Sequence, residues 1–430
     1  MNRTNQGSRS GSAGINLPAL RSHNAALVLG LLRSAGEEGI SRLELAERTG
    51  LTPQAVSKIT ARLRAEGLAA EAGRRASTGG KPRTLLRLVT HAGHAVGLHL
   101  DRDELTAVLV DLSGATVAVR HAPLDLGAGA EVVLGTAVRE VGALLAAGLP
   151  GPRRHGSPQA AEAPGTSASP APSEPSEPAD GGPGGARPGD GRPGGAGARP
   201  VAPPRQHVLG VGVAMPGPLD HRTGVLHRVT GFPEWDGYPL RDALAARLGL
   251  PVVLDKDTNA AALGCALEEG DADSFAYLHL GTGLGAGLVF RGTVHRGART
   301  GAGEFGHQVI QLDGPECSCG NHGCIEALCL AAVARGDTTG AARVLGEGAA
   351  NLISLLDIDR VLLGGRVVTA DEEAYVGGVQ AALRARAQSD GIPVTVAEGG
   401  PRLVADGAAQ LVLAPLFGRV DAVFPASRTD

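Results

Sequence analysis

The stretch SRLELAERTGLTPQAVSKITARLRAEG, residues 41–67, decides the fold of the N-terminal part of the chain. Ser41 is followed three residues later by Glu44, and this pair forms a capping box that fixes the start of a helix. Gly50 supplies the left-handed residue that ends it. The first helix of the stretch is therefore predicted over 42–49.

A second helix follows after a tight turn. Thr52 can cap it, Pro53 occupies the favoured first helical position, and the segment runs to Gly67. Two capped helices one turn apart predict a helix-turn-helix. An ordinary three-helix bundle would show the same amphipathic pattern, so this pattern alone leaves both interpretations open.

The second helix has an apolar face and a polar face. Its apolar side chains recur at helical spacing: Val56, Ile59 and Leu63. The opposite face carries the candidate DNA contacts Gln54, Ser57, Lys58 and Arg62. The first three lie where recognition helices reach base edges, whereas Arg62 is placed for phosphates.

The residues that follow predict a basic wing. GLAAEAG and TLLRLV are typical of two strands, and the Gly-rich loop RRASTGGKPR joins them. Lys81 and Arg83 of this hairpin are candidates for contacts with the DNA backbone or a minor groove. A capped helix pair, a basic helix face and a basic wing together favour a winged helix-turn-helix over a plain bundle.

The distribution of charge supports this interpretation. Residues 1–90 hold 14 Lys and Arg against 6 Glu and no Asp, a net charge of +8, although the whole chain has −4. The remainder is therefore −12. A basic block on an acidic body predicts a polyanionic partner for that block, namely double-stranded DNA.

Composition divides the chain into domains. In 151–200, Pro and Gly supply 23 of 50 residues and large apolar residues are absent, so this window cannot form a packed core. We expect a disordered tail over 1–19, the DNA-binding domain over 20–90, and a second domain over 91–430. The latter contains a disordered insert over 151–206.

The second domain alternates short apolar strands with helical segments. VGLHL and LTAVLVDL predict a hairpin, TVAVRHAPL predicts a third strand, and a helix is expected around 131–147. Beyond the insert, strands such as VLGVGVA and FAYLHLG alternate with helices such as NAAALGCALEEG. This alternation predicts an α/β architecture around a mostly parallel sheet.

A cysteine cluster predicts a metal site. CSCGNHGCIE follows GAGEFGH, and its Cys-x-Cys-x4-Cys spacing with a nearby His offers four ligands for tetrahedral zinc. The predicted ligands are His307, Cys317, Cys319 and Cys324. Five cysteines in the whole chain, clustered in this way, do not suit a secreted disulfide framework.

With these motifs in hand, the chain resembles the ROK family, which groups sugar-responsive repressors with sugar kinases. The matching motifs are GAGEFGH, the cysteine motif, the Lys256–Asn259 segment and the N-terminal domain. The resemblance spans about 20–420 apart from the insert. It implies a two-lobed actin-like ATPase fold, also called ribonuclease H-like, acting as the sensor behind the winged helix-turn-helix.

The resemblance also implies roles for individual residues. Asp257 would be the general base for a sugar hydroxyl in kinase members, or a vestige of one. The residues that would hold the sugar ring are Asn259, Glu304, His307 and Glu326. From the residues alone, Asp257 or Asn259 could instead cap the following helix. Zinc would be structural and would brace the loop that carries Glu304 and Glu326.

One departure from the family concerns the nucleotide. Kinase members begin this domain with Asp-x-Gly-Gly-Thr, whereas His99–Asp103 stands here, so the phosphate turn has been lost. Two carboxylates and bulky side chains there should repel or block a triphosphate. Gly283, Gly285, Gly364 and Gly365 still resemble the other nucleotide loops, but these glycines could equally be tight turns of the fold.

The leading hypothesis is a sugar-responsive regulator, most simply a repressor of carbohydrate genes. It would bind a double-stranded operator as a homodimer or dimer of dimers and respond to a sugar or sugar phosphate. The alternatives are an active ATP-dependent sugar kinase that carries a DNA-binding domain, and a regulator that has lost sugar sensing. With no leader and no apolar span of membrane length, we expect a cytoplasmic protein without a membrane partner.

Overall fold

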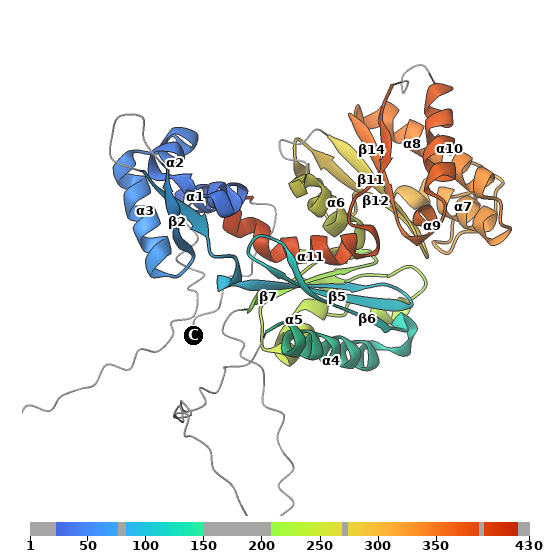
Figure 1. Ribbon diagram of the computed structural model, residues 1–430. Helices are drawn as coiled ribbons and strands as arrows, with labels where there is room; N and C mark the ends of the chain where they lie inside the picture. The colour runs from blue at the N-terminus through green and yellow to red at the C-terminus, as the bar shows by residue number, and fades with distance from the viewer. Residues whose placement is uncertain (1–22, 76–82, 150–207, 269–273, 387–390, 420–430) are drawn as a thin grey trace, which may run out of the picture.

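The computed structural model describes residues 23–75, 83–149, 208–268, 274–386 and 391–419. The predicted tail over 1–19, the predicted insert over 151–206, and Lys81 of the predicted wing lie outside the described residues. Figure 1 shows the N-terminal domain at one end of the molecule, beside a lobe formed around β5 and β7 and a second lobe formed around β11 and β14.

The N-terminal domain is a winged helix-turn-helix, as predicted. Its elements are α1 (His23–Ser34), β1 (Ile40–Ser41), α2 (Arg42–Thr49), α3 (Pro53–Ala65), β2 (Ala69–Arg75) and β3 (Arg83–Leu88), with the strands in the order β1-β3-β2. The Ser41 hydroxyl accepts the Glu44 N–H and the Glu44 carboxylate accepts the Ser41 N–H, which completes the capping box. Thr52 caps α3 through the Ala55 N–H.

The first lobe is a five-stranded sheet in the order β10-β7-β4-β5-β6, with α4 and α5 on one face (Figure 1). Its elements are β4 (His94–Leu100), β5 (Glu104–Asp111), β6 (Thr116–Pro123), α4 (Ala130–Gly148), β7 (Val208–Met215), α5 (Leu240–Leu248) and β10 (Val252–Lys256). The short β8 (Leu219–Asp220) and β9 (Val225–Leu226) pair beside it.

The second lobe is a five-stranded sheet in the order β13-β12-β11-β14-β15. Its strands are β11 (Phe275–Leu280), β12 (Leu284–Phe290), β13 (Thr293–Val294), β14 (Arg360–Gly364) and β15 (Val394–Val396). The helices packed with it are α7 (Ile325–Ala334), α8 (Thr338–Leu356), α9 (Arg366–Thr369) and α10 (Glu372–Arg384).

Two helices lie between the sheets, namely α6 (Asp257–Glu268) and α11 (Leu403–Leu413), as Figure 1 shows. α11 packs on the first sheet and α6 packs on β12. The backbone of α11 approaches those of β4 and α6 very closely, because glycine occupies the contact points. A Cβ added to Gly97 of β4 would lie 1.9 Å from the Ala405 carbonyl oxygen, and one added to Gly407 would lie 2.0 Å from that of Ala260.

The prediction of a mostly parallel sheet is wrong, because both sheets are mixed. In the first, β10 and β4 flank β7 in parallel, whereas β4-β5-β6 form an antiparallel meander. In the second, β14 pairs in parallel with β11 and β15, and β11-β12-β13 are antiparallel. The physical reason is local: the antiparallel strands are joined by short turns, and a parallel crossover needs a longer connection.

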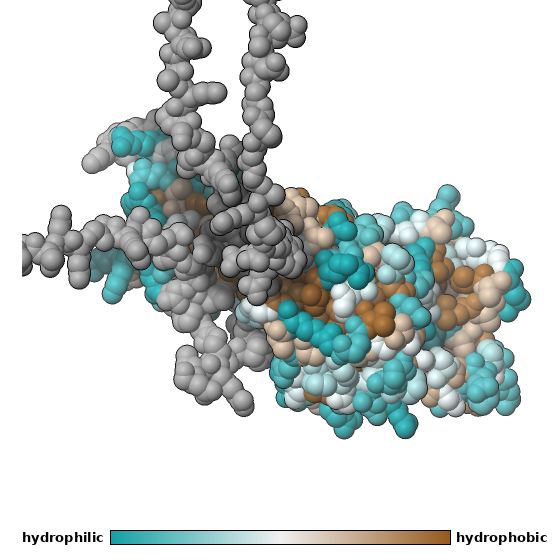
Figure 2. Space-filling view, turned by 90° about the horizontal axis from the view of Figure 1, so that it is seen from below, coloured by the Kyte–Doolittle hydropathy of each residue, from teal (hydrophilic) through white to brown (hydrophobic). Residues whose placement is uncertain are grey.

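The surface carries both hydrophilic and hydrophobic residues. Figure 2, seen from below, shows hydrophilic residues over much of the visible lobe surface, with hydrophobic residues in separate patches between them. Among the helices that the structure describes, none has the length and apolar character required to cross a bilayer.

Candidate functional site

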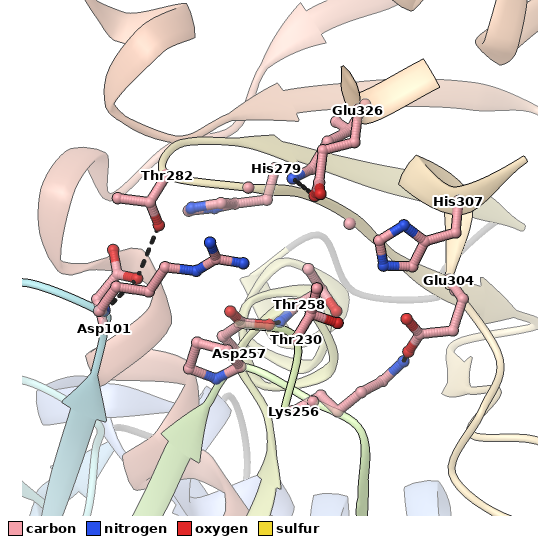
Figure 3. Close-up of a pocket in the computed structure, with 17 residues that line it drawn as sticks. Asp101, Thr230, Lys256, Asp257, Thr258, His279, Thr282, Glu304, His307 and Glu326 are labelled. Carbon is pink, nitrogen blue, oxygen red and sulfur yellow. Dashed lines mark hydrogen bonds and ion pairs between the residues drawn. The ribbon is translucent and has the colours of Figure 1, made fainter. Parts of the chain in front are cut away.

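A polar cleft that opens to solvent lies between the two lobes. Both lobes line it, and α6 begins at its floor. The lining residues that carry polar side chains are Asp101, Arg102, Thr230, Lys256, Asp257, Thr258, His279, Thr282, Glu304, His307 and Glu326. Figure 3 shows Asp101 and Thr282 at one end of the cleft, Glu304 and His307 at the other, and Asp257 between them.

Asp257 occupies the central position because strand β10 ends there and helix α6 starts there. Its carboxylate accepts a hydrogen bond from the Thr258 N–H at 2.6 Å, so it also satisfies a backbone donor at the start of the helix. Burial, reinforced by the charge of the nearby Asp101, raises the pKa of Asp257 to about 7. A carboxyl group with this pKa can exchange a proton with a ligand hydroxyl near neutral pH.

The Glu304 end of the cleft is fixed by ion pairs between the lobes. The Lys256 ammonium lies 2.9 Å from the Glu304 carboxylate and also donates to the Ala302 carbonyl at 2.5 Å. Next to it, the buried pair Arg296–Asp255 closes at 2.6 Å. Because one member of each pair belongs to each lobe, these contacts hold Glu304 in position over the floor of the cleft.

Asn259 does not occupy the position predicted for it. Its side chain is completely buried, donates to Asp255 at 2.8 Å, and is absent from the residues that line the cleft. Residues two apart on a helix do not share a face, so with Asp257 directed to the cleft, Asn259 turns into the protein. Asn259 therefore supports Asp255, which in turn holds Arg296.

At the other end of the cleft, the turn between β4 and β5 reaches across to the second lobe. The Asp101 carboxylate accepts from the Thr282 hydroxyl at 3.2 Å, and the Asp103 carboxylate pairs with Arg366 at 2.9 Å. Asp101 also faces His279, whose pKa is lowered to about 4 mainly by burial. The turn that would hold ATP phosphates in a kinase here joins the lobes.

The four glycines of the predicted nucleotide loops each have a packing role. Gly283 and Gly285 line the cleft, and added Cβ atoms would lie 3.0 Å from the Glu326 carboxylate and from the Thr258 side chain respectively. A Cβ on Gly364 would meet the Tyr277 hydroxyl at 2.5 Å, and Gly365 has a positive φ of 92°. Fold geometry alone accounts for glycine at these positions.

The metal motif forms a compact cluster beside the cleft. The ligand atoms of His307, Cys317, Cys319 and Cys324 all lie within 4.8 Å of one another, so the four side chains could hold a metal ion. His307 Nδ1 is 3.7 Å from Cys317 Sγ, and Cys319 Sγ is 3.7 Å from Cys324 Sγ. His307 also lines the cleft, which connects the cluster directly to the ligand site.

Glu326 is positioned by the same segment, on the first turn of α7 just after Cys324. Its carboxylate is nearly buried and accepts the Leu284 N–H at 2.7 Å. Glu304, His307 and Glu326, which the family resemblance implies as sugar ligands, therefore all line the cleft, and Glu326 additionally fixes the turn that carries Gly283.

The predicted DNA-binding face of α3 is exposed. Val56 and Leu63 point into the core, Ile59 is half-buried, and the exposed residues are Gln54, Ser57, Lys58 and Arg62. Arg62 forms a 2.9 Å ion pair with Glu66 on the same helix, a surface pair worth only about 0.3–0.5 kcal/mol. Arg83 is exposed at the start of β3, at the base of the wing.

Several cleft residues escaped the sequence analysis. Lys256 had a readable signal, because a lysine inside the buried strand VVLDK needs a partner. Arg102 was noted only as part of a degenerate turn. Thr230 and His279 carried no local signal, since only the folded chain brings their segments to the cleft.

Two family models match the chain. A ROK family model matches residues 201–335, and a winged helix-turn-helix DNA-binding model matches residues 28–69. A putative xylose repressor of Caldicellulosiruptor sp. (strain Rt8B.4) is 28% identical over 67% of this chain and 59% of that protein. A glucokinase of Thermotoga maritima is 41% identical over 29% of this chain and 40% of that protein. The chain spans about three fifths of the length of the xylose repressors that it matches.

Solved structures agree with this assignment of the fold. A crystal structure of a ROK family transcriptional regulator, a homologue of the E. coli MLC protein, superposes with a TM-score of 0.64 at 20% identity, over 93% of this chain and 98% of that one. A ROK family glucokinase from Streptomyces griseus, solved with glucose and AMPPNP, gives 0.52 at 23% identity, over 74% and 99%. The chain thus combines an N-terminal winged helix-turn-helix with a two-lobed sugar-kinase-like fold, in which residues 201–335 match the ROK family.

Proposed function

We propose that the protein is a sugar-responsive, DNA-binding transcriptional regulator, most simply a repressor of genes for carbohydrate uptake or catabolism. One observation carries the proposal. A DNA-binding domain, whose recognition helix has an exposed basic face, packs against a lobe that lines a polar cleft suited to a sugar. The names of its relatives, among them a putative xylose repressor and the N-acetylglucosamine repressor, favour the same function.

On the DNA side, α3 enters a major groove as a recognition helix. Gln54, Ser57 and Lys58 contact base edges, Arg62 contacts phosphate, and the wing with Lys81 and Arg83 contacts the backbone or a minor groove. Two such domains in a homodimer, or in a dimer of dimers, read two half-sites of one double-stranded operator.

On the ligand side, a sugar lies over Asp257, with Glu304, His307 and Glu326 around its hydroxyls. Carboxylates and imidazole are suitable partners for hydroxyl groups, and these four side chains come from both lobes. Closure of the lobes on the sugar distinguishes the bound state from the free state, and ligand acts through its different affinity for the two.

A continuous chain of packing joins the cleft to the DNA-binding domain. α6 starts at Asp257 and packs on α11, which runs directly into the 3-10 helix η9 (Ala414–Phe417) against α1. At that junction the Arg33 guanidinium lies 4.8 Å from the Phe417 ring centre and donates to the Ser113 carbonyl at 2.9 Å. A shift of α6 on ligand binding would thus reach α1 through apolar contacts.

Zinc is the metal that fits the cysteine cluster. Two sulfur atoms bound to one tetrahedral zinc at ~2.3 Å lie ~3.8 Å apart, and Cys319 and Cys324 are 3.7 Å apart here. Three thiolates and one imidazole leave no open position for chemistry, so the ion is structural. It would hold His307 at the edge of the cleft and brace the segment between Glu304 and Glu326.

Sugar kinase activity is the second candidate function, and the raised pKa of Asp257 at the cleft floor favours it. The turn with Asp101 and Asp103 opposes it, because its contacts with Thr282 and Arg366 cross the gap where ATP phosphates would lie. ATP-dependent phosphorylation of a sugar that Asp257→Asn abolishes would establish the kinase instead of the regulator.

Replacing Lys58 and Arg62 by Ala together should weaken DNA binding and flatten its dependence on salt. Loss of Arg62, the proposed phosphate contact, lowers the slope of log K against log salt concentration by about one, and loss of Lys58 removes a further positive charge and a base contact. The measurement is fluorescence anisotropy of a mixed-sequence DNA duplex with the full-length protein over a salt series. Arg343→Ala, an exposed arginine on α8, is the matched control and should leave the slope unchanged. An unaltered slope in the double variant would place the DNA contact elsewhere.

A further inference from the structure

Arg102 presents an unused guanidinium to the cleft. The residue lies on the turn between β4 and β5, is half-buried, and lines the cleft opposite Gly283. A Cβ added to Gly283 would lie 3.3 Å from Arg102 Nη2, so the guanidinium reaches the second lobe. Among the described residues it has no ion pair or side-chain hydrogen bond, and its guanidinium carbon lies over the Phe232 ring, 5.9 Å from the ring centre.

The other charges around this turn are already engaged. Asp103 pairs with Arg366 at 2.9 Å, and Lys256, the second cation of the cleft, pairs with Glu304. Asp101 accepts from Thr282 and from the Arg102 N–H. Arg102 is therefore the cation of the cleft that is left without an anion, and a guanidinium in that position forms its strongest contacts with a phosphate or carboxylate.

The position of Arg102 specifies where such an anion would lie on the ligand. Figure 3 shows Asp257 between Asp101, which precedes Arg102 on the turn, and the Glu304 end of the cleft, so a sugar ring over Asp257 directs one substituent toward that turn. Thr282 and Gly283 of the second lobe line the cleft on the side that Arg102 reaches, so the Thr282 hydroxyl and the Arg102 guanidinium both border that space.

We propose that the ligand of the cleft is a phosphorylated sugar, with its phosphoryl group on Arg102 beside Thr282 and Gly283 and its ring over Asp257. The inference rests on the proposed function and deepens it by choosing between a free sugar and a sugar phosphate. A nucleotide does not fit the same position, because the contacts of Asp101 and Asp103 with the second lobe cross the path that its remaining phosphates would follow.

The acidic floor of the cleft is compatible with a phosphoryl group. Asp257 has a pKa raised to about 7 by burial and by the Asp101 charge, so a large fraction of its carboxyl groups carry a proton near neutral pH. In that form the group adds no negative charge beside the phosphoryl group and donates a hydrogen bond to an oxygen of the sugar ring that lies over it. Asp257 can thus bind the ligand through a hydrogen bond without catalysing phosphoryl transfer.

The test is calorimetric titration of the full-length protein with matched pairs: glucose, mannose and N-acetylglucosamine, each beside its 6-phosphate, and inorganic phosphate as the minimal probe. At least one sugar phosphate should bind about 10- to 100-fold more tightly than its parent sugar, the range that a charge-assisted contact supplies. Arg102→Ala should reduce that ratio to near one, and Arg102→Lys should restore part of it. Arg343→Ala is the control and should keep the wild-type ratio.

Three results would overturn the inference. They are equal affinity for a sugar and its phosphate, a phosphate preference that survives in Arg102→Ala, and no binding of any phosphorylated probe. Anisotropy of bound DNA in the same samples separates this from the function proposed above. A neutral sugar that shifts DNA affinity leaves the regulator intact and refutes only the sugar phosphate.

Discussion

Replacing Cys319 by Ser is expected to abolish zinc binding at the proposed site and, with it, the proposed response of DNA binding to sugar. The four ligand atoms lie within 4.8 Å of one another, and a serine hydroxyl does not substitute for a thiolate on zinc. Without the ion, the segment between Glu304 and Glu326 must order itself unaided. His307 belongs to both the cluster and the cleft, so the loss is transmitted directly to the ligand site.

The measurement is zinc content per chain by atomic spectroscopy, paired with DNA anisotropy with and without sugar. Cys329→Ala is the matched control, because Cys329 is buried on α7 outside the cluster and contacts the Ala341 carbonyl. This variant should lose some stability and keep one equivalent of zinc. A full metal equivalent in Cys319→Ser would mean that the ligand set is wrong.

Gly407→Ala should destabilise the sensor domain severely, although alanine favours helices over glycine by about 1 kcal/mol. The added methyl group would lie 2.0 Å from the Ala260 carbonyl oxygen, a backbone atom that cannot turn away. Relief requires α11 and α6 to separate. We expect a loss of about 3 kcal/mol in the free energy of unfolding and a fall in melting temperature of roughly 5 to 10 °C.

Thermal unfolding followed by circular dichroism measures this loss. Gly377→Ala is the same substitution on α10 at a position with no atom within 4 Å of the added Cβ. It should leave the melting temperature unchanged or raise it slightly, by about 0.5–1 kcal/mol of stability. A Gly407→Ala protein that melts at or above the wild-type temperature would refute the close packing of α6 and α11.

The sequence predicted best those features that depend on neighbours along the chain. The capping box of Ser41 and Glu44, the cap at Thr52 and the cysteine spacing are local, and the structure reproduces each of them. The incorrect prediction of a mostly parallel sheet also concerned a feature that depends on neighbours along the chain. The hairpin formed by β4 and β5 was itself predicted, and its short turn already requires an antiparallel pair.

The sequence predicted the ligand site less completely, because that site depends on which way side chains turn and which segments meet. The family resemblance implied that Asn259 holds the sugar ring, yet Asn259 lies two helical positions from Asp257 and its side chain therefore points away from the cleft, toward Asp255. Arg102 and Thr230 reach the cleft from segments far from Asp257 in the sequence. Tertiary packing alone brings them there, and no periodicity or motif encodes it.

The measurement that tests the proposed function most directly is a genome-wide map of the sites that the protein occupies in its own cells, grown with and without the sugars that the adjacent genes consume. The account predicts discrete sites with paired half-sites beside genes of sugar uptake or catabolism, and an occupancy that changes when the corresponding sugar is supplied. Scattered binding without discrete sites, or discrete sites whose occupancy ignores every such sugar, would contradict it.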